Sequence, residues 1–353
     1  MLYKQDWGNV KKAYEAWWNK DLDYPLLQVT SPKEGTRYTS YNGWEFLQYK
    51  CCPEKALDIF EESCQHIYFG AEAFPNIWMN LGPGSLASYF TGFLKFDREN
   101  NTAWFESPRS WEKVEALEFK EDNEWWKYTK YITELSAKRG KDKFIVGTTD
   151  IGGVLDVLSS FRGAQNLLVD LIEEPNMIFD MSEKILEAWF KVYSDLYNIT
   201  EKYQDGTSAW MGIWCPKRWY PLQCDFSAMI SPKMFERFVA PYLRKQCEWL
   251  DYSIYHLDGP GEIPHLDILL DIPELTGIQW VPGDGNYQCD SPEWFPMYKK
   301  ILAKNKLLVL QSFDNKDNIP NVLREVGGKG ILFSTWFDNE INAERFIEKI
   351  RNV

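Results

Sequence analysis

Two ionisable side chains follow directly on a short apolar segment of the sequence. The segment Tyr252–Tyr255 is rich in β-forming residues, which predicts a buried strand, and His256 and Asp258 come at its end. A helix is expected over residues 262–270 and a second strand over 277–281, so the two strands should be parallel neighbours. Ligands bind beyond the carboxyl ends of such strands. We therefore expect His256 and Asp258 to bind a metal or to act as acid and base, the alternative being that each only caps a turn.

Other reactive or polar residues occupy the same kind of position elsewhere in the chain. Residues 143–149 predict a buried strand that ends at Asp150, which is either a catalytic residue or the cap of the next helix. Residues 207–214 predict a strand that ends at Cys215. The residues expected to contact substrate also lie at strand ends, and they are Asn80, Trp214, Trp280, Gln311 and Ser334. Since parallel strands end at one edge of their sheet, we expect these side chains to face a common cavity.

Strands and helices alternate along the chain, with about eight strands of the parallel type, which predicts a (β/α)8 TIM barrel. We expect a single α/β domain over residues 1–353, with N-terminal helices in an extension over about 1–60. The first barrel strand is predicted within residues 67–80. Residues 92–105 predict an inserted β-hairpin, and residues 114–119 a short second strand.

The composition favours a small-molecule partner. The formal net charge of −13 opposes binding to nucleic acid or to an anionic membrane, and no apolar segment is long enough to span a bilayer. The N-terminus is charged and amphipathic and does not resemble a signal peptide, and the seven cysteines form no C-x-x-C pair. These features predict a cytoplasmic protein with free thiols. The 16% of aromatic residues leaves room for an aromatic-lined pocket, which would suit sugars or quaternary ammonium groups.

Four stretches carry a more specific pattern, and they occur in order along the chain. They are TDIGGVLDVLSSFRGAQNLLVDLIEEPNMI (149–178), CDFSAMISPKMFERFVAPYL (224–243), YHLDG (255–259) and GKGILFST (328–335). Together they resemble the uroporphyrinogen decarboxylase superfamily, which includes methyltransferases that move methyl groups from corrinoids to thiols. The resemblance covers most of residues 50–350.

For the methyltransferases, the resemblance implies a zinc site built from His-x-Cys after the fifth strand and a Cys after the eighth. Zinc holds the acceptor thiol as a nucleophilic thiolate. Here the first motif reads His256-x-Asp258, and Asp is a competent zinc ligand. The last strand offers no Cys, so Cys215 is the candidate for the third ligand, with Glu262 and His265 as further candidates. The resemblance thus implies Zn²⁺ held by Cys215, His256 and Asp258, and a corrinoid supplied by a partner protein.

The decarboxylases of the superfamily use an aspartate after the first strand and N-terminal arginines to hold a polycarboxylate. This chain has Asn76 or Asn80 at the first position and only Arg37 in the N-terminal loop. An anionic macrocycle would meet too little positive charge, so uroporphyrinogen is not the expected substrate.

Three other functions stay open at this point. A metal-free decarboxylase or lyase would use Asp258 or Asp150 to stabilise a protonated intermediate. A carbohydrate-active barrel would combine these carboxylates with Trp214, Trp280 and Trp336 near strand ends. A non-catalytic binding barrel would have lost the metal.

Overall fold

The computed structural model describes residues 1–36, 39–106 and 109–352, so Arg37 lies outside the described residues. The strands are β1 (Leu26–Pro32), β2 (Ile67–Ala71), β3 (Asn76–Trp78), β4 (Lys95–Asp97), β5 (Thr102–Trp104), β6 (Ile145–Thr148), β7 (Ser208–Ala209), β8 (Trp219–Leu222), β9 (Tyr252–Asp258), β10 (Gly277–Val281), β11 (Leu307–Leu310) and β12 (Ile331–Trp336).

The α-helices are α1 (Trp7–Trp18), α2 (Glu45–Gln48), α3 (Glu54–His66), α4 (Leu86–Thr91), α5 (Trp111–Glu115), α6 (Glu124–Gly140), α7 (Val154–Arg162), α8 (Ala164–Glu173), α9 (Pro175–Thr200), α10 (Pro232–Phe238), α11 (Ala240–Trp249), α12 (Leu266–Leu270), α13 (Phe295–Ala303), α14 (Ile319–Val326) and α15 (Glu340–Arg351). The 3-10 helices are η1 (Asp225–Met229), η2 (Pro260–His265), η3 (Pro292–Trp294) and η4 (Lys316–Asn318).

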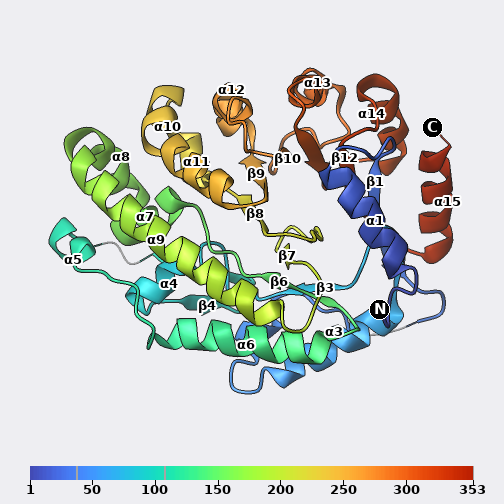
Figure 1. Ribbon diagram of the computed structural model, residues 1–353, viewed down its shortest axis with the longest axis horizontal. Helices are drawn as coiled ribbons and strands as arrows, with labels where there is room; N and C mark the ends of the chain where they lie inside the picture. The colour runs from blue at the N-terminus through green and yellow to red at the C-terminus, as the bar shows by residue number, and fades with distance from the viewer. Residues whose placement is uncertain (37–38, 107–108, 353) are drawn as a thin grey trace.

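The fold is mixed α/β, with a large and mostly parallel sheet. A seven-stranded sheet has the order β2-β1-β12-β11-β10-β9-β8, in which only the edge pair β1–β2 is antiparallel. A second, parallel sheet has the order β3-β6-β7. Helices surround both sheets on the outside, as Figure 1 shows. The first and last long strands of the chain, β1 and β12, pair with each other in parallel.

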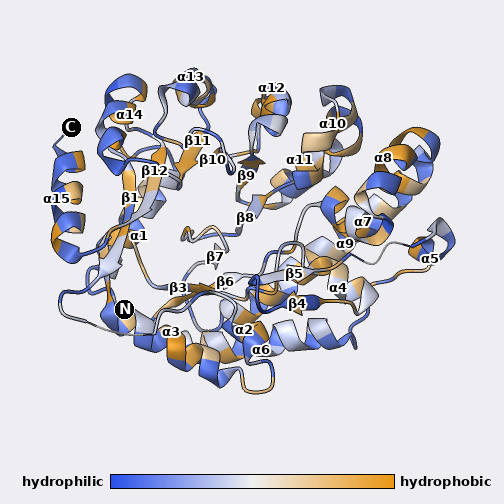
Figure 2. Cartoon of the chain, turned by 180° about the vertical axis from the view of Figure 1, so that it is seen from behind, coloured by the Kyte–Doolittle hydropathy of each residue, from blue (hydrophilic) through white to orange (hydrophobic). Residues whose placement is uncertain are grey.

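The pattern of hydrophobic residues explains this layering. The parallel strands are apolar runs, and in β6 and β11 every residue is buried, so neither face of these strands meets solvent. Helices cover the outward face (Figure 1). In α1, the residues Val10, Tyr14 and Trp17 are buried on one face while the other face meets solvent. Figure 2 shows β10–β12 coloured mainly as hydrophobic and the surrounding helices carrying both colours. Among the described residues, no helix combines the length and the apolar character that crossing a bilayer requires.

Several predicted elements are confirmed and others are wrong. Strands β9 and β10 and the hairpin β4–β5 form where they were expected. The predicted strand within residues 67–80 is instead two strands, because the chain turns at Ala71, whose φ is +48°. Residues 114–119 form no strand, since α5 runs to Glu115. Strand β1 lies within the expected N-terminal extension, for which helices were predicted, and it is a member of the main sheet.

The largest departure concerns residues 207–215. Only Ser208–Ala209 is a strand, and the chain then turns through Gly212, whose φ is +72°. Thr207 and Cys215 pair in an antiparallel bridge across this turn. The strand that lies beside β9 is therefore β8, one segment later than the sequence predicted.

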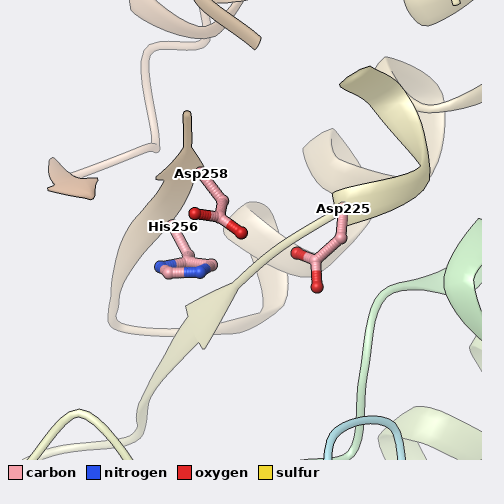
Figure 3. A group of neighbouring side chains, drawn as sticks. All are labelled: Asp225, His256 and Asp258. Atoms are coloured by element: carbon pink, nitrogen blue, oxygen red, sulfur yellow. The ribbon is translucent and has the colours of Figure 1, made fainter. Parts of the chain in front are cut away.

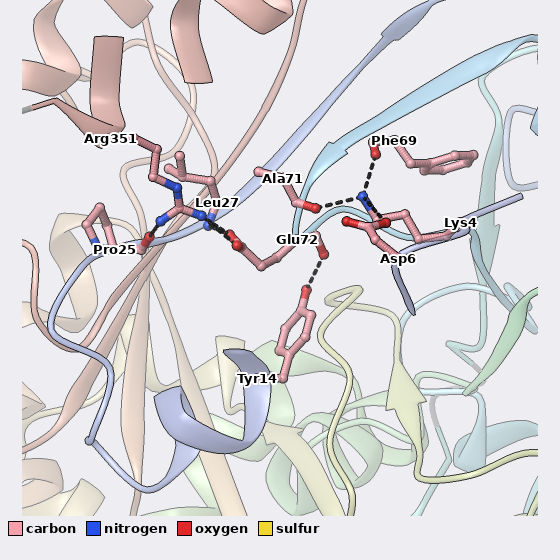
Figure 4. A network of polar contacts seen from close by, with 9 residues as sticks. All are labelled: Lys4, Asp6, Tyr14, Pro25, Leu27, Phe69, Ala71, Glu72 and Arg351. Carbon is pink, nitrogen blue, oxygen red and sulfur yellow. Dashed lines mark hydrogen bonds and ion pairs between the residues drawn. The ribbon is translucent and has the colours of Figure 1, made fainter. Parts of the chain in front are cut away.

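A polar network ties the two ends of the chain together (Figure 4). Arg351, the last residue of α15, donates to both carboxylate oxygens of Glu72 at 2.5 and 2.7 Å and to the backbone oxygen of Pro25 at 3.0 Å. Glu72 also accepts a hydrogen bond from the backbone N–H of Leu27 at 2.8 Å. Its side chain is only 10% exposed, so its charge depends on Arg351 for compensation.

We predict that Arg351→Ala lowers the free energy of unfolding by about 2 kcal/mol, because it leaves the Glu72 carboxylate buried without its cation. Lys349 is a matched control on the same helix, since it pairs with Asp317 at the surface. Its replacement by Ala should cost less than about 0.5 kcal/mol. Urea unfolding of both variants measures the difference, and equal losses would contradict this role for Glu72.

Candidate metal centre

Three side chains from two adjoining segments converge at the carboxyl ends of the strands. His256 and Asp258 are two residues apart on β9, so they lie on the same face of that strand. Asp225 begins η1, just after β8, and β8 pairs with β9 in parallel. Each residue offers one ligand atom, and the three atoms lie within 4.8 Å of one another. Figure 3 shows the two carboxylates and the imidazole ring gathered in one place.

The position of Asp225 is set by a second, buried carboxylate. Asp156, in the first turn of α7, accepts hydrogen bonds from the backbone N–H groups of Phe226 at 2.8 Å and Asp225 at 3.2 Å. The chain after β8 approaches α7 so closely that a Cβ at Gly153 would lie 2.2 Å from the backbone oxygen of Gln223. Gly153 therefore permits the contact that aims Asp225 at β9.

Carboxylates dominate the electrostatics around the three residues. Burial, together with the negative charge of Asp225, raises the pKa of Asp150 to about 7, the pKa of Asp156 to about 8 and the pKa of Glu262 to about 9. The side chain of Asp225 is exposed at one edge of the group, but partial loss of its hydration still raises its pKa, which His256 lowers and Asp258 raises. In the described part of the chain, no lysine or arginine is among the groups that shift these four pKa values. Such a site favours a bound cation.

The tautomer of His256 is fixed by a chain of hydrogen bonds. The backbone oxygen of Met211 can only accept, so the Gln311 side chain donates its Nε2–H to it, at 3.2 Å. The Oε1 atom of Gln311 then accepts from Gln279 Nε2, which leaves Gln279 Oε1 to accept from His256 Nδ1 at 2.6 Å. Nδ1 therefore carries the proton, and Nε2 presents its lone pair as a ligand or a base. We call His256, Gln279, Gln311 and the Met211 carbonyl the amide relay.

The turn that follows β7 holds this relay in place. Trp210 packs edge-on against the His256 ring, with ring centroids 5.2 Å apart and an interplanar angle of 88°. The backbone oxygen of Gly212 accepts from Gln28 of β1 at 2.7 Å, and that of Trp214 accepts from Trp18 of α1 at 2.9 Å. The turn thus links α1 and β1, near the N-terminus, to the distant strand β9.

Cys215, the expected third metal ligand, is not part of the group. Its thiol is fully buried, and burial raises its pKa far above the ordinary range. The charges that act on it are those of Asp251 and Lys217, which precede β9 and β8, whereas His256 and Asp258 lie at the end of β9. The early turn at Gly212 returns the chain to the beginning of β8, and Asp225 takes the position predicted for Cys215.

The residues expected to contact substrate have separate locations. Gln311 and Ser334 line one cavity. Trp214 is buried among Trp7 and Tyr14, and Trp280 is buried against Trp294, so neither ring is available to a ligand.

Of the remaining candidates, Asn80 accepts from the backbone N–H of Gly82 and holds a turn. Asp150 is 6% exposed, and its charge interacts with that of Asp225. Trp336 is half exposed at the end of β12. With Trp214 and Trp280 enclosed, the aromatic platform that suggested carbohydrate is not formed.

Sequence reasoning missed Asp225 and Gln279. Asp225 lies within CDFSAMISPKMFERFVAPYL, the stretch that carries the family resemblance, and it follows the apolar run Trp219–Leu222. Gln279 is a polar residue inside an otherwise apolar strand, directly opposite His256 in the register of β9 and β10. A buried amide at that place is a signal in itself, because it needs a partner.

A comparison with protein families finds no match for this sequence, and a comparison with curated proteins finds none either. Among solved structures, the chain is similar to a methyltransferase from Methanosarcina mazei, with a TM-score of 0.60 and 11% identity. The similarity covers 97% of this chain and 98% of that one. At this identity the likeness establishes a shared fold.

Asp150 predicts a pH dependence of stability. Its folded pKa, about 7, lies above the ordinary value of 3.8 for an aspartic acid, so its contribution to stability is present below about pH 4 and is lost as the pH rises through 7. At about 1.4 kcal/mol per pKa unit, the loss is at most on the order of 4 kcal/mol. Asp150→Asn should therefore flatten the fall of the unfolding free energy between pH 5 and pH 8, measured in chelator. An unchanged slope would contradict the raised pKa.

The amide relay predicts that metal affinity depends on Gln279. Gln279→Leu removes the acceptor for His256 Nδ1–H, and zinc affinity measured by calorimetry should fall by about 10–100-fold. Gln279→Glu is the matched control, because a carboxylate still accepts from Nδ1 and should keep affinity close to that of the wild type. Equal affinities of the Leu variant and the wild type would show that the relay does not orient His256.

Proposed function

We propose that this protein is a methyltransferase-type enzyme that binds one divalent metal, most suitably Zn²⁺, through Asp225, His256 and Asp258. The observation that carries the proposal is the convergence of these side chains at the ends of parallel strands, in a fold shared with a methyltransferase. Active sites of parallel α/β folds lie at that edge.

The proposal includes a (β/α)8 barrel built from the two parallel sheets. Its support is the parallel pairing of β1 with β12, which brings the first and last long strands of the chain together. Further support comes from the register of β6 with β7 and of β8 with β9, which leaves the turn after β7 between the two sheets. The Met211 and Gly212 carbonyls reach residues of β1 and the end of β11 from there.

The donor set suits zinc. Catalytic zinc takes three protein ligands, nitrogen and carboxylate oxygen among them, and keeps one position for a water or a substrate. Asp225, His256 and Asp258 supply one nitrogen and two carboxylates, and the lone pair of His256 Nε2 is left free by the relay. Their pairing with a divalent ion would also offset the crowding of carboxylates described above.

When bound, zinc would lower the pKa of a thiol substrate and present it as a thiolate. The protein's own groups hold that arrangement. Asp156 fixes the backbone at Asp225, Gln279 keeps the proton on Nδ1 of His256, and Trp210 packs against the ring. In this proposal a corrinoid carried by a partner protein supplies the methyl group, as the sequence resemblance implies.

A metal-free decarboxylase or lyase is the second candidate, and one observation favours it. Burial raises the pKa of Asp150 to about 7 and that of Asp156 to about 8, so both carboxyl groups can hold a proton near neutral pH. Asp150 could then deliver a proton to a substrate carbanion while His256 acts as the base.

Elemental analysis separates the two candidates. Protein purified without chelator or affinity metal, and then supplied with zinc, should hold one zinc per chain. His256→Ala and Asp225→Asn should lose most of it while the fold stays intact. Methyl transfer from methylcobalamin to a thiol, followed by the absorbance of the corrinoid, should disappear in the same variants.

Cys215→Ser is the control for this experiment, because the thiol lies apart from the three ligands and the variant should keep its zinc. Zinc that persists in His256→Ala, or wild-type protein that takes up none, would contradict the metal proposal. Zinc-free protein that releases CO₂ from a carboxylated substrate would favour the second candidate.

A further inference from the structure

A cavity of about 330 Å³ is lined in part by Trp210, the residue that packs against the metal-ligand candidate His256. It lies among the strands β1, β3 and β12 and the turn after β7. The residues that the following argument uses are Asn76, Trp78, Trp210, Gln311 and Ser334. They are neither fully buried nor fully exposed, as expected of walls that a ligand can reach.

Two residues connect this cavity to His256. Trp210 lines the cavity and packs against the imidazole ring, and Gln311 lines it and belongs to the amide relay. A molecule that fills the cavity therefore contacts the same side chains that position His256. A substrate whose body fills the cavity would have its reactive end directed past Trp210 and Gln311 toward His256.

The charge of the lining is the informative property. Among the described residues that line the cavity, none is Asp, Glu, Lys, Arg or His. A carboxylate, sulfonate or phosphate would be desolvated there without a cation, and it would lie close to an acidic centre. An ammonium group would lose its water without a carboxylate in the lining to replace it, and the nearby carboxylates would already be paired with the metal.

The lining also offers two buried polar atoms without a hydrogen-bond partner among the described residues, the Tyr41 hydroxyl and Asn76 Oδ1. The Asn76 Oδ1 atom is buried and accepts no hydrogen bond from the described residues, although buried amide oxygens are nearly always paired. Aromatic side chains, Trp78 and Trp210 among them, and uncharged polar side chains share the walls. This combination suits an uncharged molecule that carries a hydrogen-bond donor for Asn76.

We infer that the substrate held here is an uncharged small molecule, a thiol with one hydroxyl or amide donor directed at Asn76. The inference rests on the proposed function for the identity of the reactive group. The polarity of the cavity itself does not depend on that function.

A series of thiols of similar size tests the charge. The neutral 3-mercapto-1-propanol, the anion 2-mercaptoethanesulfonate and the cation thiocholine are titrated into metal-free and zinc-loaded protein, with calorimetry and tryptophan fluorescence as readouts. The neutral thiol should bind at least 10-fold more tightly than the sulfonate in both forms, and at least 10-fold more tightly than thiocholine in the zinc-loaded form. Equal or tighter binding of the sulfonate in either form, or of thiocholine in the zinc-loaded form, overturns the inference.

Two variants test the site. Asn76→Ala should weaken 3-mercapto-1-propanol by about 5–10-fold and leave 1-butanethiol, which has no hydroxyl, unchanged. Ser334→Lys places a cation in the lining, so this variant should bind the sulfonate more tightly than the neutral thiol. If both variants bind the thiols as the wild type does, the assignment of the cavity is contradicted. Neutral binding without any methyl transfer would refute the proposed function and leave this inference standing. Methyl transfer to the sulfonate as efficient as to the neutral thiol would support the proposed function and refute this inference.

Discussion

The hydrogen bonds that Asp156 accepts from the backbone of Asp225 and Phe226 are the contact on which the candidate site depends. They tie the start of η1 to the first turn of α7, and so they determine where the chain goes after β8. Without this contact Asp225 would have no reason to face β9. The charges of Asp156 and Asp225 also oppose each other, so a cation bound at Asp225 would relieve that repulsion. One residue thus serves both the position and the charge of the centre.

The second constraint is the turn after β7. Its backbone carbonyls accept hydrogen bonds from the side-chain amides of Gln28 and Gln311, which lie inside the molecule and need partners there. In return, Gln311 orients Gln279, and Gln279 orients His256. The centre is therefore built from neutral amides on one side and carboxylates on the other, which gives each side a separate role in binding.

Much of the secondary structure and part of the site could be predicted from the sequence. Strand β9 with His256 and Asp258 at its end follows from an apolar run that stops at Gly and Pro. Strand β8 could not be recognised in the same way, because Pro221 in its middle is atypical of an interior strand. The turn at Gly212 then made residues 207–214 look like the missing strand, and Cys215 was chosen in place of Asp225.

The sequence led to the prediction of Trp280 as a site residue, whereas its neighbour Gln279 is the residue that contacts His256. The physical cause is different here. Successive residues of a strand point to opposite faces, so an error of one residue in register exchanges the inside for the outside. The pairing of Gln279 with His256 is long-range information that the local pattern of β10 does not contain. Partly for this reason, only two of the five residues proposed as substrate contacts, Gln311 and Ser334, line the cavity.

The pairing of β1 with β12 has a consequence for the order in which the molecule forms. Gln28, which donates to the turn after β7, belongs to β1. Its partner in the parallel register is Ser334 of β12, close to the C-terminus. Contacts between such distant parts of a chain carry a high entropic cost and form late in folding. During synthesis, His256 would be made well before the strand that completes the support of its relay. The centre would then acquire its final geometry only after the last strand has left the ribosome, so a truncated or stalled chain would not present a finished metal site.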